Sequence, residues 1–175
     1  DILEAKRSGK TGIILGWQNA TPIENDLDRL GLFHRLGVRI VQVTYHERNL
    51  LGNGCYERRD DGLSHFGVDA IGEMNRLGIL VDLSHVGEKT TLDAIETSQK
   101  PVAFTHANAR SYHDVPRNKT DEALKALADR GGVVGVTCIV TFLRTGYEST
   151  VDDYAEAIDD MVGRVTSGGW GHRVG

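Results

Sequence analysis

The chain has 175 residues, of which 39% are hydrophobic and 26% are charged, and its formal net charge at pH 7 is -5. This composition is typical of a globular protein, and the acidic balance argues against a nucleic-acid partner. No apolar run approaches the roughly 20 residues of a membrane span, and the length falls short of the roughly 250 residues of a complete eight-stranded α/β barrel.

Apolar runs alternate with amphipathic segments along the chain. In chain order we expect a helix over residues 1–9, a strand over 12–17, a helix over 24–36, a strand over 38–45, a helix over 63–76, a strand over 77–85, a helix over 88–98, a strand over 100–106, a helix over 120–131, a strand over 133–139, a helix over 151–165 and the opening of a strand at 172–175. Between the second strand and the third helix lies a long loop, residues 46–62, and loops of that length are often functional.

This alternation predicts parallel strands joined by helical crossovers, either in an open doubly wound sheet or in a closed barrel. The glycine-rich nucleotide-binding motifs of the open sheet do not occur. Polar residues follow the carboxyl ends of successive strands, where barrels carry their active sites: Gln18, Tyr45, His85 and His106. We therefore predict that residues 1–175 form a single, incomplete domain, a portion of a (β/α)8 TIM-type barrel.

Two of the expected strands end in a histidine, His85 and His106. If these strands are neighbours about 4.8 Å apart, both imidazoles project from one rim and can reach a single metal ion. The alternative is a pair of strand-end histidines held by ordinary hydrogen bonds. Asp82 points away from His85 by strand alternation, so we interpret it as a hydrogen-bonding group rather than a ligand.

Four segments carry a family resemblance: residues 61–67 (DGLSHFG), 77–86 (LGILVDLSHV), 104–109 (FTHANA) and 116–118 (PRN). Together they resemble the membrane dipeptidase (renal dipeptidase) family of zinc peptidases, peptidase family M19, and the resemblance covers nearly the whole chain. It implies a barrel with two zinc ions on its carboxyl rim that hydrolyses dipeptides.

The resemblance also implies roles for individual residues. His85 and His106 match two family histidines that bind zinc, and Arg117 matches an arginine that holds the substrate carboxylate, a task that suits a planar, always charged guanidinium. From the residues alone, without the family match, we favour the interpretation of Arg117 as a solvated loop arginine.

At two positions the chain departs from the family pattern. Gln18 stands where the family has a bridging glutamate, and Tyr45 stands where the family has a histidine that contacts the substrate carbonyl. An amide offers one good oxygen and no charge, so we expect the second zinc ion to bind weakly or not at all. Tyr45 is still able to donate a hydrogen bond to an oxyanion. His46 follows where the chain leaves the sheet, and its role stays open.

The metal-binding His-x-Asp pair and the catalytic aspartate of the family do not occur here. We therefore interpret the chain as an internal fragment of a zinc-dependent dipeptidase, inactive alone; the alternatives are another metal-dependent barrel hydrolase, such as a lactonase or amidase, and a non-catalytic homologue. The expected partner is a dipeptide substrate. Open sheet edges favour association into a homo-oligomer.

Cys55 and Cys138 have no paired spacing and predict reduced thiols and a cytoplasmic location, although a leader ahead of the fragment is compatible with its first residues.

Overall fold

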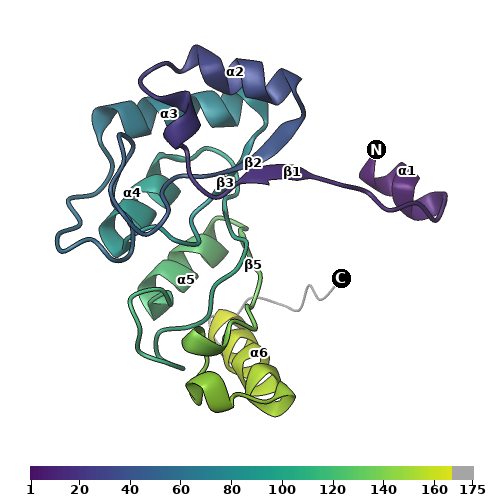
Figure 1. Cartoon of the computed structure of the whole chain (residues 1–175), viewed down its shortest axis with the longest axis vertical. Helices are drawn as coiled ribbons and strands as arrows, with labels where there is room; N and C mark the ends of the chain where they lie inside the picture. The colour runs from purple at the N-terminus through teal and green to yellow at the C-terminus, as the bar shows by residue number, and fades with distance from the viewer. Residues whose placement is uncertain (167–175) are drawn as a thin grey trace.

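The structure is a computed structural model that describes residues 1–166 of the chain (Figure 1). Within these residues five parallel strands form one sheet in the order of the chain: β1 (Leu15–Trp17), β2 (Val38–Gln42), β3 (Leu80–Asp82), β4 (Ala103–Phe104) and β5 (Val133–Val134). The α-helices are α1 (Ile2–Arg7), α2 (Asp28–Arg35), α3 (His65–Leu77), α4 (Glu88–Thr97), α5 (Asp121–Asp129) and α6 (Val151–Thr166). Short 3-10 helices cover Thr21–Ile23 (η1), Val140–Phe142 (η2) and Gly146–Glu148 (η3).

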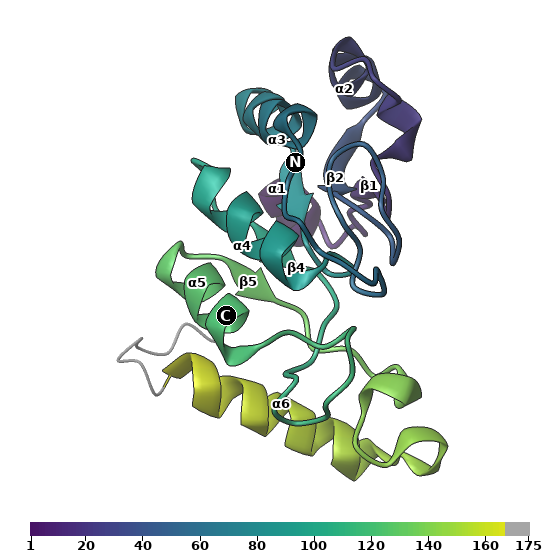
Figure 2. The same cartoon turned by 90° about the vertical axis from the view of Figure 1, so that its left-hand side faces the viewer.

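The helices that follow the first strand lie side by side in chain order, each in contact with the next from α2 to α6 (Figure 2). Helix α1 projects away from this body at the end of the extended segment that leads into β1 (Figure 1). Parallel strands in chain order, each followed by a helix on the same side, are the arrangement of a β/α barrel opened between two of its units. The predicted α/β class and partial-barrel architecture are therefore confirmed.

Several predicted boundaries were wrong. The strands are shorter than the apolar runs; β5 covers two residues where the sequence predicted seven. Helix α2 begins at Asp28 because Glu24 turns the chain with φ 50° and the Asp26 carboxylate accepts a hydrogen bond from the Asp28 amide at 3.0 Å. The amphipathic pattern of residues 24–36 predicts that Leu36 faces inward, but its side chain is 65% exposed. The strand predicted at 172–175 lies outside the described residues.

Local sequence signals account for the long helix α3 that positions β3. The Ser64 hydroxyl accepts a hydrogen bond from the Gly67 amide, which caps the first turn, and Gly78 ends the helix in the left-handed region with φ 74°. The face between these ends buries Ala70, Ile71 and Met74 completely. Two residues, Gly78 and Ile79, separate the end of α3 from the start of β3.

Two smaller expectations from the sequence have an outcome here. Among the described residues, no helix combines the length and apolar character that crossing a bilayer requires. Cys55 and Cys138 are both free thiols. The cellular compartment stays a prediction.

Lys119 is a buried lysine beneath the ends of β3 and β4. Its side chain is 2% exposed, and Nζ donates hydrogen bonds to the Val86 carbonyl at 2.7 Å and to Thr91 Oγ1 at 3.3 Å. Nζ also lies 5.0 Å from the centre of the Phe104 ring. Burial, reinforced by the charge of Arg117, lowers the pKa of Lys119 to about 7.

We expect this shift to make stability depend on pH. In the unfolded chain the Lys119 pKa is about 10.4, so between pH 7 and 10 the unfolded state binds a proton that the folded state does not. The free energy of unfolding contributed by Lys119 therefore rises with pH across this window, by up to about 1.4 kcal/mol per unit. Urea denaturation at pH 6 to 9 measures the free energy of unfolding of wild type and of Lys119→Met. We expect the value for wild type to rise relative to that of the variant as pH rises. A difference that does not change with pH would contradict the expectation.

Candidate metal centre

The carboxyl ends of β3 and β4 bring two imidazoles into contact. Asp82 of β3 pairs with Ala103 of β4, and the chain beyond each strand carries His85 and His106 to the same rim. Their Nε2 atoms lie 2.8 Å apart and their ring centres 4.8 Å apart, with His85 only 5% exposed. The two side chains that the sequence singled out therefore point at each other.

Burial makes both rings neutral near pH 7. It lowers the pKa of His85 to about 2, and the neighbouring charge of Arg117 and the His106 ring act in the same direction. The pKa of His106 is also lowered, again chiefly by burial and then by Arg117. A neutral imidazole keeps one ring nitrogen with a free lone pair, which is the form that binds a metal ion.

The pair fits one edge of a zinc coordination sphere. Tetrahedral zinc with bonds of roughly 2.05 Å to two imidazoles separates their nitrogens by roughly 3.3 Å, so the Nε2 atoms need to part by roughly 0.5 Å. Gln18 adds an amide, whose Nε2 lies 3.5 Å from His106 Nε2, and turning that amide presents Oε1 to the same point. Among the described residues, no group of three or more His, Cys, Asp or Glu side chains is placed to hold a metal. These residues supply part of a site.

Gln18 follows β1, and its backbone carbonyl is hydrogen-bonded by Gln42 of β2. The Gln42 side-chain amide donates hydrogen bonds to the Gln18 carbonyl at 2.5 Å and to the Thr44 carbonyl at 2.7 Å. Gln42 is fully buried, so the start of the loop after β1 has a fixed position. The side chain of Gln18 stands beside the histidine pair, with its Nε2 3.5 Å from His106 Nε2.

Asp82, interpreted from the sequence as a hydrogen-bonding group, lies behind the pair and is 2% exposed. Its carboxylate accepts hydrogen bonds from the Ser84 amide at 3.0 Å and hydroxyl at 2.5 Å, and from the Thr105 amide at 3.1 Å and hydroxyl at 2.7 Å. It therefore links the chain after β3 to the chain after β4.

Aromatic rings pack against His85. The Tyr45 ring stacks on it with centres 4.2 Å apart and planes 24° apart, and the His46 ring lies 4.6 Å away. His46 adopts φ 61°, which turns its side chain back toward the site, where it also meets Tyr56 with centres 4.7 Å apart. Its Nε2 is buried and has no hydrogen-bond partner within the described residues. Strand alternation gave no sign of this position, because His46 lies beyond the end of β2.

Arg117 is fully buried, so the interpretation as a solvated loop arginine was wrong. One of its terminal nitrogens donates to the His106 carbonyl at 2.5 Å, and its guanidinium lies 5.2 Å from the centre of the Phe142 ring. Nε and Nη1 are buried without a partner within residues 1–166. Burial lowers the pKa of Arg117 from its ordinary value, although a guanidinium stays charged at pH 7. Unpaired donors on a buried cation are suited to bind an anion.

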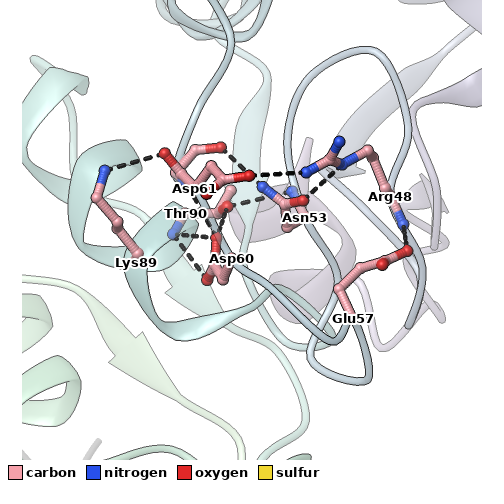
Figure 3. Close-up of polar contacts among 8 residues, drawn as sticks. Arg48, Asn53, Glu57, Asp60, Asp61, Lys89 and Thr90 are labelled. Carbon is pink, nitrogen blue, oxygen red and sulfur yellow. Dashed lines mark hydrogen bonds and ion pairs between the residues drawn. The ribbon is translucent and has the colours of Figure 1, made fainter.

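The long loop of residues 46–62 is tied to the start of α4 by a polar network (Figure 3). Asp60 accepts hydrogen bonds from the Thr90 amide at 3.1 Å and hydroxyl at 2.6 Å, and so caps the first turn of the helix. Arg48 donates to Asn53 at 2.8 Å and to Asp61 at 3.0 Å. These contacts give the loop a fixed shape.

That loop also supports His85 through its backbone. The Cys55 amide donates to the His85 carbonyl at 2.9 Å, and the Asn53 carbonyl accepts from the Gly87 amide at 2.9 Å. Gly54 lies between them, and a Cβ there would stand 2.0 Å from the backbone carbon of His46. Only glycine fits so close an approach. The loop therefore positions both His46 and His85.

Comparisons with known proteins show which family the chain resembles. The model of the family described as membrane dipeptidase (peptidase family M19) matches residues 1–172. An uncharacterized dipeptidase of Schizosaccharomyces pombe is 34% identical over 98% of this chain and 42% of its own length.

Solved structures also resemble the chain. An amidohydrolase from Pseudomonas aeruginosa is 48% identical with a TM-score of 0.90, over 98% of this chain and 55% of the other. A metallo peptidase from Rhodobacter sphaeroides, liganded with a phosphinate mimic of the dipeptide L-Ala-D-Ala, is 30% identical with a TM-score of 0.87, over 94% of this chain and 50% of the other. The chain thus spans about half the length of these solved relatives.

Proposed function

Because the chain belongs to the membrane dipeptidase family, peptidase family M19, we propose that it forms part of a metal-dependent dipeptidase that hydrolyses the peptide bond of dipeptides. The observation that carries this proposal is the contact of two imidazoles, one buried and one half-buried, through their Nε2 atoms at 2.8 Å. The Rhodobacter sphaeroides relative, which carries a dipeptide mimic, supports the choice of substrate.

We propose that the metal is zinc and that His85 and His106 hold it through Nε2, with Gln18 as a weak neighbouring ligand. Zinc held there would supply Lewis acidity toward a carbonyl and an activated water at neutral pH. A neutral amide leaves a second ion without the charge that a bridging carboxylate provides, so we expect that ion to bind weakly or not at all.

The other residues of the site bind and orient the substrate. Arg117 would pair its free Nε and Nη1 with the carboxylate of the dipeptide, which sets the distance from that carboxylate to the scissile bond. The Tyr45 hydroxyl, on a ring stacked against His85, would donate to the oxygen of the carbonyl as charge develops on it.

Hydrolysis assays test the proposal directly. The intact, zinc-loaded protein should hydrolyse free dipeptides, and masking the carboxyl group as an amide should lower kcat/KM because Arg117 loses its partner. A second candidate is amide hydrolysis beyond dipeptides, since the Pseudomonas aeruginosa relative is named an amidohydrolase. Parallel panels of dipeptides, N-acyl amides and lactones separate these classes. Hydrolysis confined to lactones or N-acyl amides would contradict the dipeptidase assignment.

A further inference from the structure

A chain of hydrogen bonds runs from the buried Asp82 to the ring of His106. Thr105 Oγ1 lies 2.7 Å from Asp82 Oδ2 and 2.8 Å from His106 Nδ1. Ser84 Oγ lies 2.5 Å from Asp82 Oδ1 and accepts a hydrogen bond from the His106 backbone amide at 3.1 Å. Ser84 and Asp82 are buried, whereas Thr105 is exposed at the rim.

Counting protons fixes the direction of these bonds. A carboxylate only accepts, so the single hydroxyl protons of Ser84 and Thr105 are both directed at Asp82. Neither hydroxyl then has a proton to give to the other, although their oxygens lie 3.1 Å apart. Thr105 Oγ1 faces His106 Nδ1 with lone pairs only, so Nδ1 must carry the ring proton and donate it. The lone pair of the neutral ring is therefore on Nε2, which faces His85.

We propose that Thr105 is a positioning residue, whose hydroxyl is oriented by Asp82 and selects the His106 tautomer that presents the Nε2 lone pair to the metal. This rests on the proposed function in one respect, the metal itself; the tautomer belongs to the protein with or without an ion. A carboxylate acting through an intervening group on a metal-binding histidine raises the affinity of the site and sets the orientation of the ring.

The second histidine has no such support. His85 Nδ1 is buried without a hydrogen-bond partner within the described residues, and its ring is held by stacking against Tyr45 at 4.2 Å. In the metal-free protein His85 Nε2 then supplies the proton of the contact with His106, and it must move that proton to Nδ1 before it binds an ion. His106 is thus ready to bind, whereas His85 must change tautomer.

A pair of matched variants tests the role of the hydroxyl. Thr105→Val keeps the shape of the side chain and removes the hydroxyl, whereas Thr105→Ser keeps the hydroxyl. We expect Thr105→Val to weaken Zn²⁺ binding roughly 10- to 100-fold in chelator competition, and Thr105→Ser to stay within about 3-fold of wild type. Equal affinity for wild type and Thr105→Val, with both folded by circular dichroism, would overturn the proposal.

A measurement on wild type alone covers the case in which Thr105→Val does not fold. The ¹⁵N shifts of the His106 ring in the metal-free protein report which nitrogen is protonated, and we expect the proton on Nδ1. A proton on Nε2 would overturn the proposal whatever the metal affinity. If the proton is on Nδ1 but the protein binds no zinc, the assignment of the His106 tautomer holds and the proposed function fails. The two failures are therefore distinguishable.

Discussion

Replacing both His85 and His106 with alanine is expected to abolish zinc retention by the intact protein. The two Nε2 atoms lie 2.8 Å apart and face one point, and alanine removes both nitrogens while leaving the strands that carry them. After gel filtration, elemental analysis should find under about one tenth of an equivalent of zinc in the double variant, and each single variant should bind zinc at least roughly 100-fold more weakly.

His65→Ala is the matched control for this loss. His65 begins α3, is exposed, and belongs to the segment that resembles the family, but it lies outside the histidine pair. We expect wild-type zinc content and wild-type dipeptide hydrolysis in this variant. Stoichiometric zinc in the folded double variant would show that the metal binds elsewhere.

Arg117→Met is expected to lower kcat/KM for free dipeptides by roughly 10²- to 10³-fold, or about 3 to 4 kcal/mol of transition-state stabilisation. The reason is that the substrate carboxylate loses the two free donors that the buried guanidinium offers it in wild type. For a dipeptide amide, which lacks the carboxylate, the same substitution should change kcat/KM by less than about 5-fold. A comparable loss on both substrates would contradict the carboxylate assignment.

The same variant should not lose stability. Without substrate, wild type buries a charged group that has two unpartnered nitrogens, and methionine fills similar space without that desolvation penalty. We therefore expect the free energy of unfolding of Arg117→Met to equal or exceed that of wild type, while Arg35→Met on the exposed side of α2 changes neither stability nor kcat/KM. Urea denaturation separates loss of function from loss of fold.

The fold and the histidine pair could be predicted from the sequence because both depend on local patterns. Apolar runs separated by helical periodicity predict parallel strands, and parallel strands bring residues at their carboxyl ends to one edge. His85 and His106 each end such a run, so their contact required only that β3 and β4 be neighbours. The strand lengths were overestimated because the apolar runs extend beyond the paired residues, into buried Leu83 after β3 and through exposed Ile13 and Ile14 ahead of β1.

Other parts of the site depend on contacts that no local pattern reports. Arg117 looks like a loop arginine until Phe142, 25 residues further along the chain, covers it. His46 turns toward the site through a positive φ, which non-glycine residues seldom adopt. Thr105 and Asp82 belong to neighbouring strand ends, and their hydrogen bond follows from the register between β3 and β4.

The most direct test of the metal centre is a crystal structure of the zinc-loaded protein, with diffraction data collected on both sides of the zinc absorption edge. We predict an anomalous peak within about 2.0 to 2.1 Å of both His85 Nε2 and His106 Nε2, with the two nitrogens parted to roughly 3.3 Å. A zinc peak elsewhere, with the two nitrogens still in direct contact, would contradict the assignment of this pair as the metal centre.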